Sequence, residues 1–380
     1  MKAPRRLVPS SCVCGGKVIV WRRSRRKSKT TPFAGDDRRH ASLPIAGWLN
    51  LILDPSLNHS RELRLRLGIT PARAGRGCLC ILVGLMKTVS HCLVCGEQIQ
   101  GRRKAAAAPF LARRIWDREP FAVELLECPA CHFMFFNPRL DDEEQGKLYA
   151  AYRDPQYQQM RQACEPWYTE RLNAGLSAPA TWKLRKARLE KIFSQHIRQF
   201  GIRSVLDFGG ARGELIQDLA PAGGAYVYDI SSVDPIPGVE KLRSIDECKS
   251  RSFDLIVCSN VLEHVAAPRE FLAQIAGITS ERTLVYMEVP WEAPRSCPVL
   301  AKRLLQQALL AVTRPALAFS LMRLGTLNLM HEHVNYFSPA TLDRLMASMR
   351  WNVLASGAYR ISESLLAERM TWSLARVRPE

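Results

Sequence analysis

Apolar and polar positions follow two different periods along the second half of the chain. The sequence predicts a helix over 182–200, another from about Pro268, and a third from Pro339 with Ser338 as its N-cap. Short apolar or alternating runs predict strands at 204–208, 225–229, 252–259, 282–290, 351–356 and 370–377. Strands that alternate with helices in this order predict a doubly wound α/β domain over 182–380.

The first half of the chain is patterned differently. Residues 121–128 alternate in part between apolar and polar side chains, which predicts a strand or hairpin within a small module over 86–140. Residues 141–181 are predicted to form a helical linker. Residues 1–85 show neither period and mix Arg-rich runs with Pro, Gly and Ser, so we expect a mostly disordered basic extension.

The net charge of the chain is concentrated in that extension. The 380 residues carry 54 Lys and Arg against 36 Asp and Glu, a formal charge of +18 that would suggest an anionic partner. Residues 1–85 hold 17 basic and 4 acidic side chains, which leaves 37 basic against 32 acidic for the rest. The body is therefore close to neutral, and this balance argues against a nucleic-acid partner.

Three explanations compete for the extension: a basic arm for nucleic acid, an organelle transit segment, or non-native sequence ahead of the true start. We favour the third, because Met86 opens directly onto the first recognisable motif. The chain contains no apolar run long enough to span a bilayer, and its first residues lack the pattern of a secretory signal. Twelve cysteines spread over a long chain fit reduced thiols and a cytoplasmic location.

Two matched CxxC pairs predict a metal site. Each pair lets two thiolates reach one ion from a tight turn, and four sulfurs complete a closed, structural Zn²⁺ site. The ligands are Cys92, Cys95, Cys128 and Cys131. Four buried cysteines or a redox pair is the alternative, and His91 or His132 could replace a sulfur. The pairs Cys12/Cys14 and Cys78/Cys80 are expected to be plain thiols.

A glycine-rich turn and then a helix are predicted after the strand at 204–208. Asp207 ends the strand, and Gly209 and Gly213 follow in a spacing that does not fit the dinucleotide motif GxGxxG. A carboxylate at this place can hold the amino group of a cationic amino-acid moiety. Asp229 ends the next strand, 22 residues further on, where an acid would accept the hydroxyls of a ribose.

These residues resemble the class I S-adenosylmethionine-dependent methyltransferases, through Val205-Leu-Asp-Phe-Gly-Gly-Ala-Arg-Gly, Asp229, and the run Phe253-Asp-Leu-Ile-Val-Cys-Ser-Asn-Val-Leu-Glu-His. The resemblance implies a Rossmann-like, seven-stranded methyltransferase sheet preceded by a small zinc ribbon, with S-adenosyl-L-methionine as cofactor. The cofactor-binding residues that it implies are Asp207, Gly209, Gly210 and Gly213 at the methionine end, Asp229 at the ribose, Asp246 at the adenine, and Asn260 and Glu263 near the sulfonium.

A narrower similarity to sugar C-methyltransferases rests on the cysteine pairs and on the stretch His331-Glu-His-Val-Asn-Tyr-Phe-Ser. It implies that His333 is a catalytic base assisted by Glu332, with His264 as the reserve candidate. A broader subgroup of zinc-ribbon methyltransferases fits at least as well. The alternative interpretation of His331 and His333 is that they cap the helix at Ser338.

An insertion at 293–330 separates the strand at 282–290 from this motif. It holds five basic residues and no acidic one, and its leucines repeat at helical spacing. We expect either a helical lid over the acceptor site or a helix packed on the core with a solvated basic face. The sharper hypothesis is a weak contact with an anionic acceptor or membrane surface.

The sequence therefore predicts methyl transfer from S-adenosylmethionine to a small-molecule acceptor, such as a nucleotide- or lipid-linked sugar or a secondary metabolite. One alternative is an RNA base methyltransferase. Another is a non-catalytic zinc-ribbon binding protein whose sheet has lost its cofactor. The sequence does not identify the acceptor atom or the oligomeric state.

Overall fold

The structure is a computed structural model that describes residues 87–152, 154–176, 179–219, 224–231, 233–361 and 368–377. The extension predicted for 1–85, with its four cysteines, lies outside the described residues.

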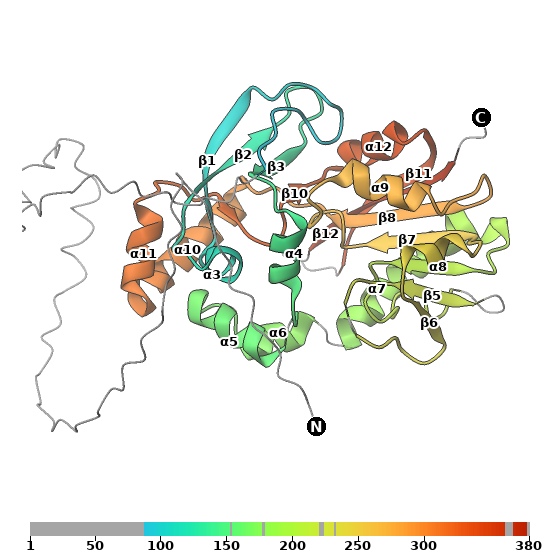
Figure 1. The fold of residues 1–380 in the computed structure, drawn as a ribbon, viewed down its shortest axis with the longest axis horizontal. Coiled ribbons are helices and arrows are strands. Elements are labelled where there is room, and N and C mark those ends of the chain that lie inside the picture. The colour runs from blue at the N-terminus through green and yellow to red at the C-terminus, as the bar shows by residue number, and fades with distance from the viewer. Residues whose placement is uncertain are drawn as a thin grey trace, which may run out of the picture. The chain divides into compact units, whose positions relative to one another are not determined.

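The described chain alternates short strands and helices (Figure 1). The strands are β1 (Gly101–Ala107), β2 (Ala122–Glu127), β3 (Met134–Asn137), β4 (Val205–Phe208), β5 (Ala225–Tyr228), β6 (Val239–Leu242), β7 (Leu255–Ser259), β8 (Leu284–Pro290), β9 (Leu329–Met330), β10 (Asn335–Tyr336), β11 (Trp351–Arg360) and β12 (Arg369–Val377). The helices are α3 (Pro109–Trp116), α4 (Asp142–Tyr149), α5 (Pro155–Cys164), α6 (Glu170–Leu176), α7 (Pro179–Ile192), α8 (Ile245–Lys249), α9 (Pro268–Ala276), α10 (Cys297–Thr313), α11 (Pro315–Met322) and α12 (Pro339–Ser348).

A seven-stranded mixed sheet in the order β11-β12-β8-β7-β4-β5-β6 forms the larger part of the fold. The strands from β6 to β8 in this order pair in parallel, and β12 runs antiparallel to both of its neighbours. Every residue of β4 and β8 is buried, as expected for strands covered on both faces. The predicted α/β methyltransferase-like sheet is thus confirmed. Its strand order reverses between β4 and β7, where ligands bind in open α/β sheets.

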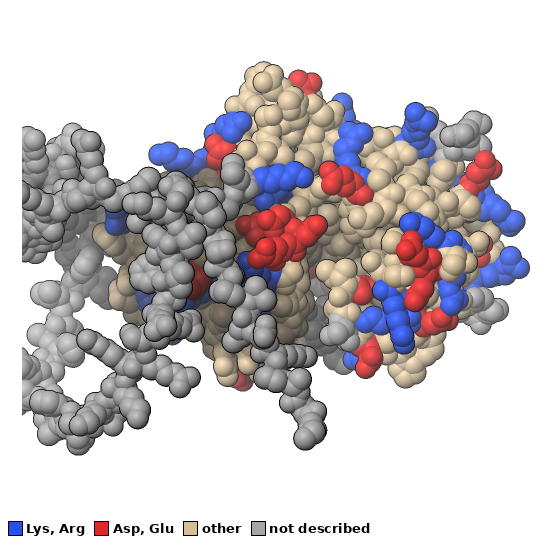
Figure 2. All heavy atoms as spheres, viewed as in Figure 1, with Lys and Arg blue, Asp and Glu red and all other residues tan. Residues whose placement is uncertain are grey.

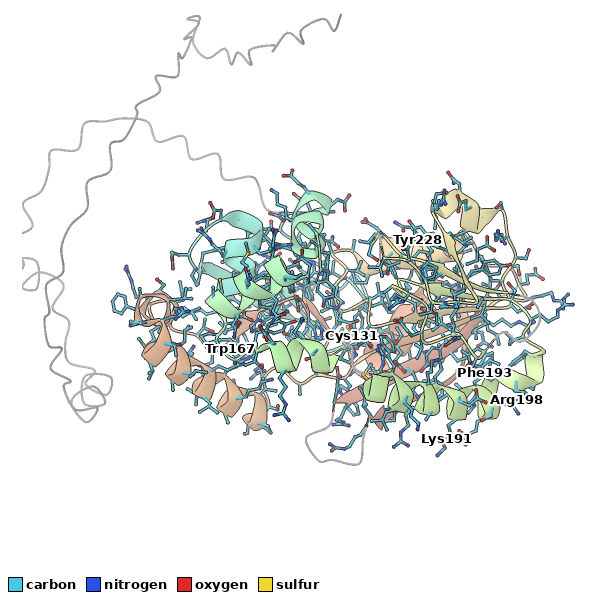
Figure 3. The ribbon with its side chains drawn as sticks, turned by 90° about the horizontal axis from the view of Figure 1, so that it is seen from below. Cys131, Trp167, Lys191, Phe193, Arg198 and Tyr228 are labelled. Atoms are coloured by element: carbon cyan, nitrogen blue, oxygen red, sulfur yellow. The ribbon has the colours of Figure 1, made fainter. Side chains whose placement is uncertain are left out.

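Local structure departs from the sequence prediction in two places near this sheet. The segment after β4 was expected to be a helix, but 211–219 form successive turns with backbone bonds such as Leu219 N–H to Ile216 O at 2.9 Å. The helix predicted over 182–200 begins at Pro179 and ends in a π-helical turn, Phe193–Ile197, and a 3₁₀ turn, Arg198–Phe200 (Figure 3). Phe193 and Ile197 pack into the core there, which fixes this ending.

A five-stranded sheet in the order β10-β3-β2-β1-β9 forms the second part of the fold. The strand predicted at 121–128 is its β2. Its outer strands come from the chain beyond residue 328, because β9 pairs with β1 in parallel and β10 pairs with β3 antiparallel. The segment between β9 and β10 is His331–His333, so the sheet positions both ends of this motif.

Arg139 ties the five-stranded sheet to the loop that follows β7. Its side chain is buried, with 2% of the residue exposed, and its guanidinium donates to the carbonyl oxygens of Val265 and Val334 and to Oδ1 of Asn335 at 2.7 Å. Burial lowers the pKa of Arg139 to about 9. One buried cation therefore holds together the loops that carry His264 and His333.

Helices α10 and α11 make up most of the insertion at 293–330. They pack through Leu310, Ala318 and Leu321 into the same apolar cluster as Phe110 and Leu111 of α3. In Figure 1 both helices lie on the side of the five-stranded sheet that faces away from the seven-stranded sheet. Within the described residues, no helix is long and apolar enough to cross a membrane.

The visible surface of the seven-stranded part carries both signs of charge. Figure 2 shows basic and acidic side chains side by side over β5, β6 and α8. Part of this mixture is paired, as in Arg251 with Glu240 at 2.6 Å and Lys249 with Asp246 at 3.0 Å. This face has no broad basic area of the kind that a nucleic-acid backbone requires.

Candidate active site and metal centre

The four cysteines of the CxxC pairs converge on one point. Cys92 Sγ lies 3.6 Å from Cys131 Sγ, and Cys95 Sγ lies 3.5 Å from Cys128 Sγ. All four sulfurs lie within 4.8 Å of one another. Four thiolates at the corners of a tetrahedron around Zn²⁺ are separated by about 3.8 Å, given Zn–S bonds of about 2.3 Å. The sulfur positions therefore fit one tetrahedral ion.

The turns at each pair explain how the sulfurs are presented. Each pair has a backbone turn, closed by Gly96 N–H to Cys92 O at 2.9 Å and by His132 N–H to Cys128 O at 3.0 Å. Neither histidine of the module joins the sulfur cluster, since His91 is exposed and His132 faces Glu127 at 4.0 Å. Burial raises the pKa of Cys92 to about 11, so a bound cation would be needed to hold this sulfur as a thiolate.

Asp207 ends β4 at the strand-order reversal and is buried, with one carboxylate oxygen, Oδ2, lacking a hydrogen-bond partner among the described residues. Burial raises the pKa of Asp207 to about 7. A buried carboxylate with a free oxygen is costly to leave unpaired, and a cationic ligand would offset that cost.

The glycines after β4 keep the space above Asp207 open. A Cβ atom on Gly210 would lie 1.9 Å from Cγ of Asp207, and one on Gly209 would lie 2.6 Å from a methyl group of Val261. Gly209 and Gly213 also have φ angles of +84° and +75°, a region that side chains disfavour. Gly209 therefore requires glycine both for its close contact and for its backbone conformation.

Asp229 lies at the end of β5 beside the glycine turn. Its Oδ2 accepts the Ala211 N–H at 2.9 Å, and its Oδ1 accepts the Ser231 N–H at 2.7 Å. Each carboxylate oxygen keeps a second lone pair for a ligand hydroxyl. The adjacent Ile230 is 84% exposed, an apolar surface next to a carboxylate that sequence reasoning did not single out.

Asp246 does not join this group. It lies in the first turn of α8, where its side chain is 83% exposed and pairs with Lys249 at 3.0 Å. The adenine contact of Asp246 therefore stays a prediction.

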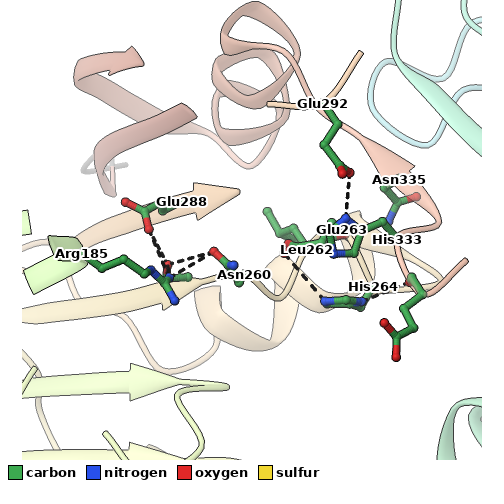
Figure 4. Close-up of polar contacts among 11 residues, drawn as sticks. Arg185, Asn260, Leu262, Glu263, His264, Glu288, Glu292, His333 and Asn335 are labelled. Carbon is green, nitrogen blue, oxygen red and sulfur yellow. Dashed lines mark hydrogen bonds and ion pairs between the residues drawn. The ribbon is translucent and has the colours of Figure 1, made fainter. Parts of the chain in front are cut away.

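Arg185 of α7 reaches the end of β7 and was missed by the sequence analysis. Its guanidinium donates to Ser259 Oγ at 2.8 Å and to Asn260 Oδ1 at 3.1 Å, and it pairs with the buried Glu288 at 3.4 Å (Figure 4). Its Nε is buried without a partner among the described residues. Arg185 is one of several basic residues in this helix, so no sequence signal distinguished it.

Glu263 follows β7 and is buried, with 1% of the residue exposed. Both carboxylate oxygens lack a hydrogen-bond partner in the described structure, and burial raises the pKa of Glu263 to about 8. Its own carbonyl oxygen accepts the N–H groups of Val334 and Asn335, which fixes the loop against β10. Backbone hydrogen bonds therefore hold in place the loop that carries this carboxyl group.

His264 and His333 face one another beside Glu263, with ring centres 4.8 Å apart (Figure 4). His264 Nδ1 lies 3.1 Å from the carbonyl oxygen of Glu332, so this nitrogen is the donor and Nε2 keeps its lone pair. Burial lowers the pKa of His264 to about 4, and the charge of His333 acts in the same direction. His264 is therefore a neutral imidazole near pH 7.

His333 has the opposite character. Burial would lower its pKa, but the carboxylate of Glu292, 2.7 Å from His333 Nδ1, raises it to about 10. Glu292 follows β8 and was not predicted as a site residue, because no motif marks it. The two histidines thus form a pair whose environments separate their pKa values, as in many acid–base sites.

The other members of the His331–His333 segment are also bound by carboxylates or cations. Glu332 accepts hydrogen bonds from the Tyr157 hydroxyl and from Arg161 Nη1, the latter at 2.9 Å. Burial would raise the pKa of Glu332, but Arg161 holds it below its ordinary value. His331 Nδ1 lies 3.3 Å from Glu165. The side chains of His331 and His333 are held by Glu165 and Glu292, so neither caps the helix at Ser338. The cap bond of that helix runs from Thr341 N–H to the Ser338 hydroxyl.

Ligand-type atoms of Glu263, His264 and His333 lie within 4.8 Å of one another, a distance that a metal ion could bridge. A protonated His333 offers no lone pair and repels a cation. The arrangement therefore fits proton transfer better than metal binding.

Comparison with known proteins agrees with the fold. A family model described as a methyltransferase domain matches residues 157–356. The match spans more than half of the chain, and the chain therefore belongs to this methyltransferase family. It is an S-adenosylmethionine-dependent methyltransferase with the class I fold. No curated protein matches the chain.

Solved structures with a similar fold include three methyltransferases. The plantazolicin methyltransferase BpumL with SAH is 12% identical, with 62% of this chain and 94% of that chain covered and a TM-score of 0.37. The N-methyltransferase NodS from Bradyrhizobium japonicum WM9 is 13% identical, covers 53% and 98%, and has a TM-score of 0.32. A SAM-dependent methyltransferase from Anabaena variabilis ATCC 29413 is 11% identical, covers 46% and 77%, and has a TM-score of 0.31.

Proposed function

We propose that this enzyme methylates a small, hydroxyl-bearing acceptor, such as a nucleotide- or lipid-linked sugar, bound beside Glu263, His264 and His333. The observation that carries the proposal is the distribution of buried polar atoms without partners in the described structure. One group, Asp207 Oδ2 and Arg185 Nε, lies at the ends of β4 and β7. The other, both oxygens of Glu263 and the Tyr149 hydroxyl, lies around the two histidines.

The first group fits the methionine end of S-adenosylmethionine. Asp207 would accept from its ammonium group, and Arg185 would pair with its carboxylate. Asp229 would accept from the ribose, and the exposed Ile230 beside it offers an apolar surface for the flat base. When bound, the cofactor supplies an electrophilic methyl group on a sulfonium. The glycine turn supplies the open space that such a ligand requires.

The second group fits an acceptor with hydroxyl groups. Glu263 and Tyr149 together can accept and donate several hydrogen bonds in a buried place, and hydroxyl groups would satisfy them. A large nucleic-acid footprint would instead demand a broad basic face, and the near-neutral charge balance of the body together with the mixed charges of the face in Figure 2 argues against one. This comparison favours a small molecule over an RNA base as the acceptor.

We assign the proton transfer to the histidine pair. His264 Nε2 has a free lone pair and takes the acceptor proton, and the charged His333 stabilises the anion that forms. The similarity to sugar C-methyltransferases implies that His333 is the base. The bond to Glu292 instead favours a protonated His333, which has no lone pair to accept a proton. Glu332, held by Tyr157 and Arg161, acts through its carbonyl oxygen, which orients the ring of His264.

The zinc module is proposed to be structural. Its four sulfurs belong to a closed set without a position for a substrate, and Cys92 and Cys128 pack in the same apolar cluster as β4 and β8. We also propose a cytoplasmic location, because all described cysteines, eight in number, are free thiols.

Calorimetric titration of the full chain with S-adenosylmethionine tests cofactor binding. Asp207→Ala should weaken binding at least about tenfold, because a charge-assisted contact is lost. Asp142→Ala, which removes an exposed carboxylate at the start of α4, is the matched control. Acceptor candidates can then be screened by mass spectrometry for the gain of one methylene unit, and unchanged binding by Asp207→Ala would contradict the assigned cofactor site.

A further inference from the structure

Helices α10 and α11 expose an unusual amount of apolar surface. Of the 17 residues of α10, only Arg303 and Leu310 are buried. Leu305 is 73% exposed and Val312 is 83% exposed. We call the exposed apolar side chains of both helices the hairpin face, which consists of Leu304, Leu305, Leu309, Val312, Phe319 and Met322.

The packing of the two helices fixes this orientation. Leu310, Ala318 and Leu321 anchor the inner side in the core, and the buried Arg303 donates from Nη1 to the carbonyl oxygen of Leu327 at 2.8 Å. An ordinary amphipathic helix turns its leucines inward and its arginine outward. Here the arginine points inward, so Leu305 and Val312 cannot reach the core without breaking this partly buried hydrogen bond.

The charges within the segment that carries the hairpin face have a single sign. Lys302, Arg314 and Arg323 are exposed, and no acidic residue occurs from 293 to 330. None of the three forms an ion pair with a carboxylate in the described part of the chain. The other two basic residues of the segment are already used, because Arg303 is buried and Arg295 lies 3.4 Å from Glu127.

We propose that the hairpin face docks on the surface of an anionic lipid bilayer, with the two helices lying in the interface. Exposed apolar side chains with exposed basic residues in the same segment match the acyl boundary and the charged headgroups of such a surface. A second copy of the chain fits less well, because two hairpin faces packed together would bring uncompensated basic residues near one another. Docking on a membrane surface is distinct from methyl transfer, and it can be measured without catalytic turnover.

Co-sedimentation of the full chain with vesicles tests this docking. Vesicles of phosphatidylcholine alone are compared with vesicles that also contain phosphatidylglycerol. The double variant Leu305→Gln and Val312→Gln should reduce partitioning to the anionic vesicles at least about tenfold, because two apolar anchors are lost without a change of charge. Lys302→Ala should reduce it about fivefold, and added salt should have the same effect.

The matched control is Leu354→Gln with Leu172→Gln, two exposed leucines on β11 and α6, which should leave partitioning unchanged. Because residues 1–85 are also basic, hydrogen exchange measured by mass spectrometry locates the contact. Protection of 297–322 by anionic vesicles supports the proposal. Equal partitioning of wild type and the Leu305/Val312 variant, or protection confined to 1–85, overturns it. If the chain instead self-associates without binding vesicles, and the Leu305/Val312 variant abolishes that self-association, the face belongs to a contact with a second copy. That outcome also overturns the proposal.

Discussion

His333 Nδ1 lies 2.7 Å from Glu292 Oε2, although 41 residues separate them along the chain. Glu292 directly follows β8, and His333 lies between β9 and β10, so the contact joins the two sheets. The bond keeps His333 protonated near pH 7, and it orients the ring toward His264. The acid–base character of the site thus depends on a carboxylate outside every recognised motif.

Replacing Glu292 by Gln should destabilise the protein by about 1 kcal/mol near pH 7, because a hydrogen bond between charged groups is lost and solvent screens it at a side chain that is 40% exposed. The raised pKa of His333 contributes stability that is fully present below its ordinary value of 6.5 and is lost as the pH rises through about 10. Urea unfolding at several pH values should therefore show the variant and wild type converging above pH 10. Glu270→Gln, an exposed change, is the control, and a difference that persists above pH 10 would contradict the ion pair.

The affinity for S-adenosylmethionine should fall as the pH drops below about 7, approaching about tenfold per pH unit. The cause is protonation of Asp207, whose pKa burial raises to about 7. Because this folded-state value lies above the ordinary 3.8, the stability contributed by Asp207 is present below pH 3.8 and lost as the pH rises through 7. The ammonium group of bound S-adenosylmethionine offsets that loss of stability. The rise in thermal midpoint that the cofactor causes should therefore grow with pH. Calorimetry on Asp207→Asn should give a weaker affinity with little pH dependence.

His264→Gln should lower kcat by about 10²- to 10⁴-fold, the usual effect of removing a general base. With saturating substrates, wild-type kcat should stay nearly constant from about pH 6 to about pH 9, because His264 is already neutral there. A kcat that rises steadily toward pH 10 would instead identify His333 as the base. Initial rates of the wild type, of His264→Gln and of His333→Gln, once an acceptor is known, separate the two assignments.

Cys92→Ser should remove the bound metal, of which about one Zn²⁺ per chain is expected. Loss of the ion should lower the thermal midpoint, because the binding free energy of a structural zinc contributes to folding. Cys297→Ser is a matched control, since that thiol is exposed and lies outside the cluster. Elemental analysis and thermal unfolding provide the two measurements, and a metal-free wild type would reject the site.

Local patterns were sufficient for much of the fold. β4, β5, β7 and β8 lie at predicted runs because buried parallel strands are continuously apolar, and α12 begins at its predicted cap residue, Ser338. The strand β6 was not predicted, since its short run places Glu240 and Lys241 at a sheet edge. The predicted helix after β4 was wrong, because tertiary contacts of the glycine turn prevail over the local helical spacing there.

The residues of the candidate site also divide into those that the sequence indicated and those that only the structure revealed. Asp207, its glycines and the four cysteines were found from spacing alone, because tight turns demand particular residue types at fixed intervals. Arg185, Glu292 and Tyr149 carry no such spacing, and only the packing of α7, β8 and α4 brings them to the site. Asp246 had a suggestive position in the sequence, but α8 turns its side chain toward solvent.

The sequence by itself determined the class I methyltransferase domain and the cysteine knuckles, since both are encoded by short-range patterns of turn, strand and ligand residues. Only the tertiary structure decided the protonation of His264 and His333 and the outward face of α10. Those properties arise from burial and from contacts between distant segments, such as Glu292 with His333 and Arg303 with Leu327. A one-dimensional pattern records neither the burial of a group nor its partners in space.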